Sequence, residues 1–244
     1  MFLHGIPDFW ASLLPLAEKL NPSGQNIFLD LPGFNGSQSP DRLTGLRIDR
    51  VVPALQLAIS RLSREPVVFV GHDWGGVFAW WLWLTRATGI DRFVTISAPH
   101  PAAFVKSMSD DVQWTMSGYA RNLATMPEPI DLDLPALASW PMDAAHREAL
   151  LEALQRSDPN AIAGYYRMNY PLARNYEISG VPGGCVPLLL LYGRSDPYVA
   201  ETTFLGALDF ANDKLEVGAI DGGHFIHLLQ VPEVAAAVKK WMDE

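Results

Sequence analysis

The segment Gly71-His72-Asp73-Trp74-Gly75-Gly76 is the strongest indicator of the fold of this chain. It follows the apolar, β-branched run Pro66-Val67-Val68-Phe69-Val70 and precedes a helical pattern that begins at Val77. This pattern predicts a strand, a sharp turn and a helix, and only small residues fit on either side of the central residue of such a turn. The N-terminus of the helix points free N–H groups at whatever the central residue attacks. We therefore predict that Asp73 is a nucleophile. A hydroxyl nucleophile suits acyl transfer, whereas a carboxylate attacks an sp³ carbon and forms an alkyl ester.

Composition limits the function classes without choosing among them. The chain has 244 residues, of which 49% are hydrophobic, enough for the core of one domain with an inserted subdomain. Its net charge of −9 argues against nucleic acid or an anionic membrane surface as a partner. The single Cys185 excludes an intramolecular disulfide and favours a reducing, cytoplasmic location. No run reaches the roughly 18 apolar residues of a membrane span, and no signal peptide is recognisable.

The rest of the chain alternates between strand and helix patterns, which favours a parallel sheet with helices on both faces. A continuous apolar run at 186–192 is typical of a strand that is buried on both faces. Residues 2–3 are predicted to end a strand, and the other predicted strands lie at 26–29, 66–70, 92–97, 186–192 and 215–220. The predicted helices lie at 9–20, 46–63 and 231–241, and one more begins at residue 77. This is an α/β fold.

The alternation breaks between Ala98 and about Pro187, a stretch rich in Pro, Met, Trp and Tyr with helical patches near 144–156 and 161–168. A structureless loop of that length is improbable inside a compact domain. We therefore predict that residues 99–187 form a helical cap, and that residues 1–98 and 188–244 form the core. The cap would cover the carboxyl ends of the strands, where ligands bind in open α/β sheets.

A carboxylate nucleophile of this kind needs a base and an acid that orients it, in the chain order nucleophile, acid, histidine. Asp196 follows the buried strand in Arg194-Ser195-Asp196-Pro197, and His224 lies in the Gly-rich loop after the last strand. Asp196 would fix the tautomer of His224, which would deprotonate the attacking water. His227 is expected to line the pocket or support the site. The spacing of the six histidines and the cysteine shows no metal-ligand pattern, so neither a metal nor a cofactor is predicted.

With these residues in place, the chain resembles the epoxide hydrolase branch of the α/β-hydrolase family. The matching motifs are His4-Gly5-Ile6-Pro7-Asp8-Phe9-Trp10, the Asp73 turn, Ala98-Pro99-His100-Pro101, Asp196 and Gly223-His224-Phe225. The resemblance implies an oxyanion hole made by the N–H groups of Ile6 and Trp74. It also implies substrate contacts from His4, Pro7, Trp74 and Tyr165.

In that family two cap tyrosines hold the oxygen of the opening epoxide. Ser117-Gly118-Tyr119 and Tyr165-Tyr166-Arg167 resemble the two segments that carry them, so the resemblance implies Tyr119 and Tyr166, with Tyr165 and Tyr170 as substitutes. A phenol with an ordinary pKa near ~10 is protonated at neutral pH and can donate to a developing alkoxide. The expected reaction converts a small apolar epoxide and water to a vicinal diol. The oligomeric state, including a homo-oligomer, stays open.

Three alternatives remain at this point. Haloalkane dehalogenases share the Asp nucleophile and the Trp after it, although Ile6 lacks the second halide donor. Haloacetate dehalogenases resemble the His4–Trp10 segment closely, although Trp74 replaces the arginine that would clamp the substrate carboxylate. The family also places two antiparallel strands ahead of the His-Gly motif, whereas this chain begins at Met1-Phe2-Leu3. The first two strands are therefore expected to be missing, which leaves room for a catalytically impaired relative.

Overall fold

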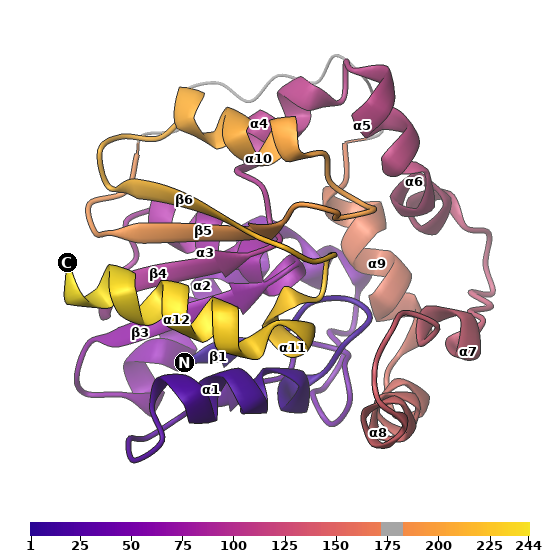
Figure 1. Cartoon of the computed structure of the whole chain (residues 1–244). Coiled ribbons are helices and arrows are strands. Elements are labelled where there is room, and N and C mark those ends of the chain that lie inside the picture. The colour runs from indigo at the N-terminus through magenta and orange to yellow at the C-terminus, as the bar shows by residue number, and fades with distance from the viewer. Residues whose placement is uncertain (172–182) are drawn as a thin grey trace.

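The central sheet has six strands in the order β2-β1-β3-β4-β5-β6, and every neighbouring pair is parallel (Figure 1). The computed structural model describes residues 1–171 and 183–244. Part of the predicted cap, 172–182, therefore lies outside the described residues. The strands are β1 (Phe2–Leu3), β2 (Phe28–Leu29), β3 (Val67–His72), β4 (Ile90–Ile96), β5 (Leu188–Gly193) and β6 (Leu215–Ile220). The predicted α/β fold with a parallel sheet is confirmed.

Helices cover both faces of this sheet, as the alternating pattern predicts (Figure 1). On one face lie α1 (Leu14–Leu20), α11 (Ile226–Leu229) and α12 (Val231–Asp243), and on the other lie α2 (Ile48–Leu62) and α3 (Trp74–Leu84). Successive residues of a strand point to opposite faces of the sheet. Leu189 and Leu191 pack in the core under α12, whereas Leu188 and Leu190 pack in the core under α3. The apolar run at β5 is thus a strand buried on both faces.

Prolines set two element boundaries that differ from the predicted ones. The helix expected at 9–20 is divided into the 3₁₀ turn η1 (Trp10–Leu13) and α1, with Pro15 in the first turn of α1. The strand expected from Val186 begins at Leu188, because Pro187 has no N–H for the ladder. Its carbonyl still accepts a hydrogen bond from the Phe93 N–H at 3.0 Å. Neither change moves a predicted site residue.

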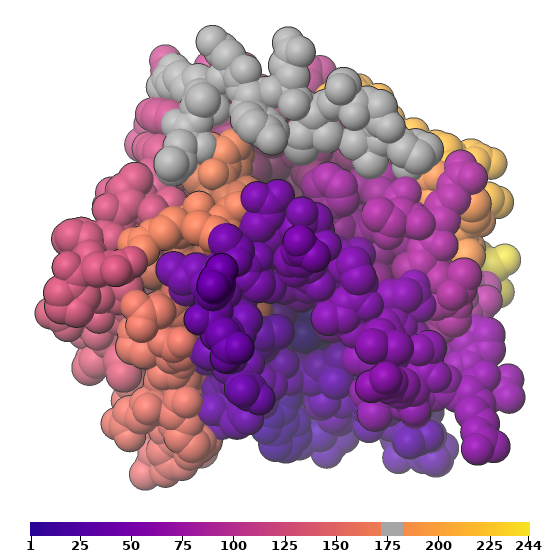
Figure 2. Space-filling view, turned by 180° about the vertical axis from the view of Figure 1, so that it is seen from behind, coloured from indigo at the N-terminus to yellow at the C-terminus, as the bar shows by residue number. Residues whose placement is uncertain are grey.

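Between β4 and β5 the described residues form six helices (Figure 1). They are α4 (Pro101–Ser107), α5 (Asp111–Met116), α6 (Gly118–Thr125), α7 (Leu134–Leu137), α8 (Ala144–Gln155) and α9 (Pro159–Asn169). Helix α9 lies against the 3₁₀ turn η2 (Leu43–Leu46), so that a Cβ at Gly164 would lie 2.7 Å from Leu46 Cδ1. Figure 2 shows this contact from behind, with the orange surface of α9 beside the purple first part of the chain.

The remaining short helices follow β5. They are α10 (Glu201–Leu205) and the 3₁₀ turn η3 (Gly206–Asp209), which lie beside α4 (Figure 1). Among the described residues, no helix has the length and apolar character that crossing a membrane requires.

Candidate active site

The turn between β3 and α3 holds Asp73 in a backbone conformation that side-chain-bearing residues seldom adopt. Its φ is 49° and its ψ is −116°, and its amide donates to the Ile96 carbonyl at 3.0 Å. The neighbouring glycines permit this turn. A Cβ at Gly71 would lie 2.3 Å from the Gly75 carbonyl oxygen, and one at Gly75 would lie 2.1 Å from that of Leu3. Strain at a single residue with small neighbours is a common feature of functional turns.

The two carboxylate oxygens of Asp73 face different groups. Oδ1 accepts a hydrogen bond from the Ile6 amide at 2.7 Å, and Oδ2 lies 3.5 Å from Nε2 of His224. The Trp74 N–H occupies the first position of α3, where no intrahelical acceptor is available. The Asp73 side chain is 13% exposed, so a small molecule can reach it while bulk water is largely excluded.

Asp196 and His224 form a buried pair beside this carboxylate. Asp196 Oδ2 lies 2.7 Å from His224 Nδ1, and its Oδ1 accepts from the amides of Tyr198 and Val199 at 2.8 and 3.1 Å. Burial by itself would lower the pKa of His224, but the carboxylates of Asp196 and Asp73 outweigh it and raise this pKa to about 10. The resting site therefore holds a protonated imidazole between two carboxylates.

Two cavities meet at Tyr119 and Tyr166, whose side chains line both. The first cavity, about 130 Å³, is also lined by Asp73 and Trp74, and its other described walls are mostly apolar. The second cavity, about 510 Å³, reaches His224 and Pro7. The tyrosine pair therefore lies at the junction, next to the Asp73 carboxylate.

The two tyrosines differ in exposure and share a chemical state. Tyr166 is 4% exposed and Tyr119 is 37% exposed, with ring centroids 6.0 Å apart. The hydroxyl of Tyr119 is enclosed even though part of the residue is exposed. Burial of the hydroxyl therefore raises the pKa of both phenols well above the ordinary value, and the charge of Asp73 raises it further. Hydrogen bonds with the Trp74 and Tyr119 side chains partly oppose this rise at Tyr166. Both phenols therefore keep their protons at neutral pH.

The structure places two residues expected to contact substrate away from the cavities. Tyr165 donates its hydroxyl to the Pro32 carbonyl at 3.1 Å, and its ring packs 5.6 Å from that of Trp74. His4 is fully buried and accepts a hydrogen bond from the Leu31 amide at 3.0 Å. Neither is among the described residues that line the two cavities. Tyr165 thus packs against Trp74, and His4 fixes the loop that follows β2.

Two aromatic residues that the sequence analysis did not single out lie at the site. Tyr198 packs its ring 5.0 Å from His224 and 4.9 Å from Tyr119. Trp140 stacks on Phe225 at 3.7 Å and lines the second cavity. The position of Tyr198, two residues after Asp196, was the available signal, whereas nothing in the sequence around Trp140 distinguishes it. Tyr170, a substitute candidate, lines the first cavity with its hydroxyl 3.7 Å from Met108 Sδ.

Comparisons with known proteins find similar sequences over part of this chain. Epoxide hydrolase 3 of Xenopus tropicalis is 34% identical over 104 residues, which cover 43% of this chain and 28% of that protein. The AB hydrolase superfamily protein YfhM of Bacillus subtilis is 31% identical over 122 residues, 49% of this chain and 42% of that protein. The matches thus span less than half the length of these relatives.

Solved structures extend the likeness to the whole fold. The crystal structure of a Bacillus megaterium epoxide hydrolase in complex with an inhibitor superposes with a TM-score of 0.86 at 18% identity, covering 100% of this chain and 92% of that one. The resemblance to epoxide hydrolases that the motifs indicate is confirmed. A family model described as the alpha/beta hydrolase fold matches residues 1–231. The chain therefore belongs to the α/β hydrolase fold family.

Proposed function

We propose that this protein is an epoxide hydrolase that converts a small apolar epoxide to a vicinal diol through an ester on Asp73. One observation carries the proposal. The Asp73 carboxylate is held between the Ile6 amide and His224, and it faces an apolar cavity in which Tyr119 and Tyr166 keep their protons. In this proposal residues 99–187 are the cap that supplies both tyrosines, and Asp73, Asp196 and His224 are the catalytic triad.

The first step opens the ring. Oδ1 of Asp73 is occupied by the Ile6 N–H, so Oδ2 is the oxygen that attacks an epoxide carbon. The new O–C bond forms as the ring C–O bond breaks, and the electron pair goes to the ring oxygen. That oxygen takes a proton from the tyrosine pair, as general-acid catalysis requires. The ester has no charge, so the pKa of His224 falls and His224 gives up its proton. That proton replaces the one that the tyrosines donated to the ring oxygen.

The second step hydrolyses the ester. Neutral His224, oriented by Asp196, takes a proton from water, and the water oxygen attacks Cγ of Asp73. Negative charge collects on Oδ1, where the N–H groups of Ile6 and Trp74 can stabilise it. The bond from Cγ to Oδ2 breaks and the diol leaves with a proton from His224. The proton of the new carboxylic acid then returns to His224, which restores the resting charges.

Two observations favour an epoxide over the halogenated substrates. The described residues that line the two cavities include no Arg or Lys, so a haloacetate carboxylate would find no arginine clamp among them. The Trp74 side chain, a halide donor in dehalogenases, interacts here with the Tyr166 hydroxyl. An alkoxide that accepts from neutral phenols suits this cavity better than an anion that needs a fixed positive charge.

Parallel assays test the proposal. Diol formation from a styrene-oxide-like epoxide is measured beside halide release from a haloalkane and from haloacetate, with Asp73→Ala as the inactive control. The expected result is diol formation that vanishes in the variant, whose fold is checked by circular dichroism and thermal melting. Halide release without diol formation would move the assignment to a dehalogenase. Absence of all three products from a folded protein would support the impaired relative.

A further inference from the structure

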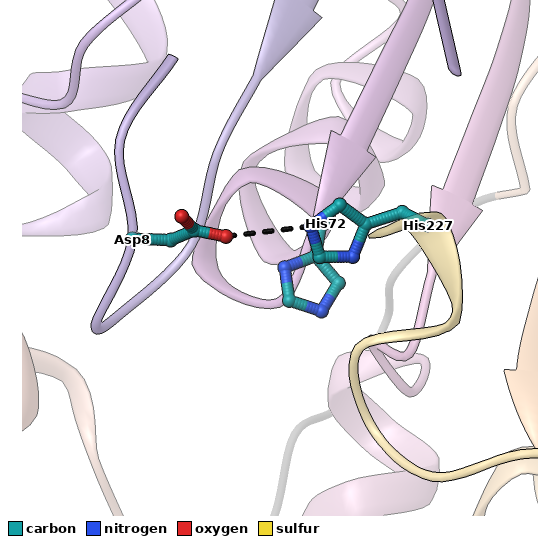
Figure 3. A group of neighbouring side chains, drawn as sticks. All are labelled: Asp8, His72 and His227. Carbon is teal, nitrogen blue, oxygen red and sulfur yellow. Dashed lines mark ion pairs between the residues drawn. The ribbon is translucent and has the colours of Figure 1, made fainter. Parts of the chain in front are cut away.

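A second group of ionisable side chains is buried beside the candidate active site, outside both cavities. It consists of Asp8 from the loop after β1, His72 at the end of β3 and His227 in α11 (Figure 3). One ligand atom from each lies within 4.8 Å of those of the other two, and at most 1% of each residue is exposed. Positions 8, 72 and 227 are so far apart that sequence spacing conceals the group.

Each member has at least one polar side-chain atom without a hydrogen-bond partner. Asp8 Oδ1 accepts from the Phe9 amide at 2.9 Å, and its Oδ2 has no hydrogen bond. His72 Nε2 donates to the His224 carbonyl at 3.1 Å, which leaves Nδ1 as a buried lone pair without a donor. Neither ring nitrogen of His227 has a hydrogen-bond partner. Unpaired buried polar atoms are costly, so three residues that converge in this way require an explanation.

This arrangement matches the surroundings of histidines and carboxylates that bind metals. A metal-ligating histidine typically donates its other N–H to a backbone carbonyl, as His72 does, and a ligating carboxylate is itself hydrogen-bonded, as Asp8 is. His72 Nδ1, which has no hydrogen-bond partner, is the ring atom that is available to a metal ion.

The distance between His227 and Asp8 fits a shared metal ion better than a bridging water molecule. His227 Nε2 lies 3.3 Å from Asp8 Oδ2. Two ligands of a tetrahedral ion with bonds of about 2.0–2.1 Å lie about 3.4 Å apart. Two partners of one tetrahedral water, at hydrogen-bond lengths of about 2.8 Å, lie about 4.6 Å apart. The donor atom of His72 lies within 4.8 Å of the other two, so binding of one ion by all three residues requires the side chains to move closer together.

We propose that Asp8, His72 and His227 form a binding site for a divalent transition metal of the zinc class. Two imidazoles and one carboxylate are a donor set that Zn²⁺ prefers. His146 of α8 is suited to the fourth position, because its Nε2 is also buried without a hydrogen bond and lies 3.9 Å from Asp8 Oδ1. The ion would connect the loop after β1, strand β3, helix α11 and helix α8. The site is structural and independent of the reaction proposed above.

Metal binding to the intact protein tests this site directly. Chelator-treated protein is titrated with Zn²⁺ by calorimetry and with Co²⁺ by visible absorption. The expected result is one ion per chain, tetrahedral Co²⁺ ligand-field bands and a melting temperature that rises with Zn²⁺. Asp8→Asn and His227→Gln should each weaken binding by more than about 100-fold, because loss of a ligand exceeds the 10–100-fold typical of a supporting residue. His146→Gln should weaken it less.

His100→Gln is the matched control, because it removes a fully buried histidine that lies outside this group. It should bind Zn²⁺ as the unchanged protein does. X-ray absorption of the Zn²⁺-loaded unchanged protein keeps the test valid even when a variant fails to fold, and should show at least two imidazole ligands at about 2.0–2.1 Å. The proposal would be overturned by a protein that binds no Zn²⁺ or by a ligand shell without imidazole. It would also be overturned if Asp8→Asn and His227→Gln bound Zn²⁺ as tightly as the unchanged protein does.

Discussion

His224 Nε2 lies 3.5 Å from Oδ2 of Asp73, too far for a strong hydrogen bond and close enough for the carboxylate to govern its charge. Burial lowers the pKa of His224, and the charges of Asp196 and Asp73 raise it to about 10. In the proposed mechanism, ester formation removes the charge of Asp73 alone. The base of the second step would thereby be released only after the first step has occurred.

This coupling predicts a pKa change that is measurable without substrate. In Asp73→Asn one of the two raising charges is lost, so the pKa of His224 should fall below about 10 while Asp196 still holds Nδ1. An NMR titration of the imidazole in both proteins measures this shift. The same sign applies to catalysis, because ester hydrolysis should accelerate as pH rises through the lowered pKa. An exposed-carboxylate variant, Asp209→Asn, is the control, and an unchanged pKa in Asp73→Asn would contradict the coupling.

His224→Gln should separate the two steps. Asp73, Ile6 and the tyrosine pair remain, so the ester can form, but no base remains to activate water, and hydrolysis should slow by about 10²–10⁴-fold. Intact-protein mass spectrometry after mixing with an epoxide should show a mass increase equal to that of one substrate. The double variant Asp73→Asn/His224→Gln should show none. An adduct that persists in the double variant would place the nucleophile elsewhere.

The adjacent tyrosines of α9 should differ sharply in effect. Tyr166→Phe and Tyr119→Phe each remove a donor at the cavity junction, so each should slow ring opening by at least about tenfold, and the double variant by more. Tyr165→Phe is the matched control. It loses only the hydrogen bond to Pro32, so activity should be nearly unchanged while the free energy of unfolding falls by about 1 kcal/mol. If Tyr166→Phe and Tyr119→Phe were as active as Tyr165→Phe, Tyr166 and Tyr119 would be excluded from the reaction.

Close packing at the nucleophile turn predicts a stability difference between two glycines. A Cβ at Gly75 would lie 2.1 Å from the Leu3 carbonyl oxygen, so Gly75→Ala must displace α3 from β1 and should lower the free energy of unfolding by about 1–3 kcal/mol or more. At Gly36 no heavy atom lies within 4 Å of such a Cβ. Gly36→Ala should therefore leave stability nearly unchanged in denaturant unfolding. Equal losses would mean that the turn is looser than described.

The local sequence pattern was sufficient to predict the position of a residue that follows a strand directly. Asp73 and His224 each lie in a glycine-containing turn after a predicted strand, and the parallel sheet brings those turns together. The two tyrosines of α9 show the limit. Tyr165 is fully buried and Tyr166 is 4% exposed, so apolar periodicity cannot tell which of them faces the cavity. The packing of Tyr165 against Phe34 and its hydrogen bond to the Pro32 carbonyl decide this.

Contacts that no motif marks could not be predicted. Asp8 comes from a loop, His72 from the end of a strand and His227 from a helix, and no sequence spacing relates them. His4, expected at the substrate, instead accepts from the Leu31 amide, a contact that depends on where the β2 loop passes. Such contacts follow from the tertiary path of the loops, which local propensity does not specify.

The most direct test of the account is a single turnover in H₂¹⁸O with protein in excess over epoxide. An ester on Asp73 supplies the second diol oxygen from its own carboxylate, so the first-turnover diol should contain no ¹⁸O, and Asp73 should carry the label in a peptide digest. A first-turnover diol that contains ¹⁸O, with an unlabelled Asp73, would show that water attacks the epoxide directly and would contradict the account.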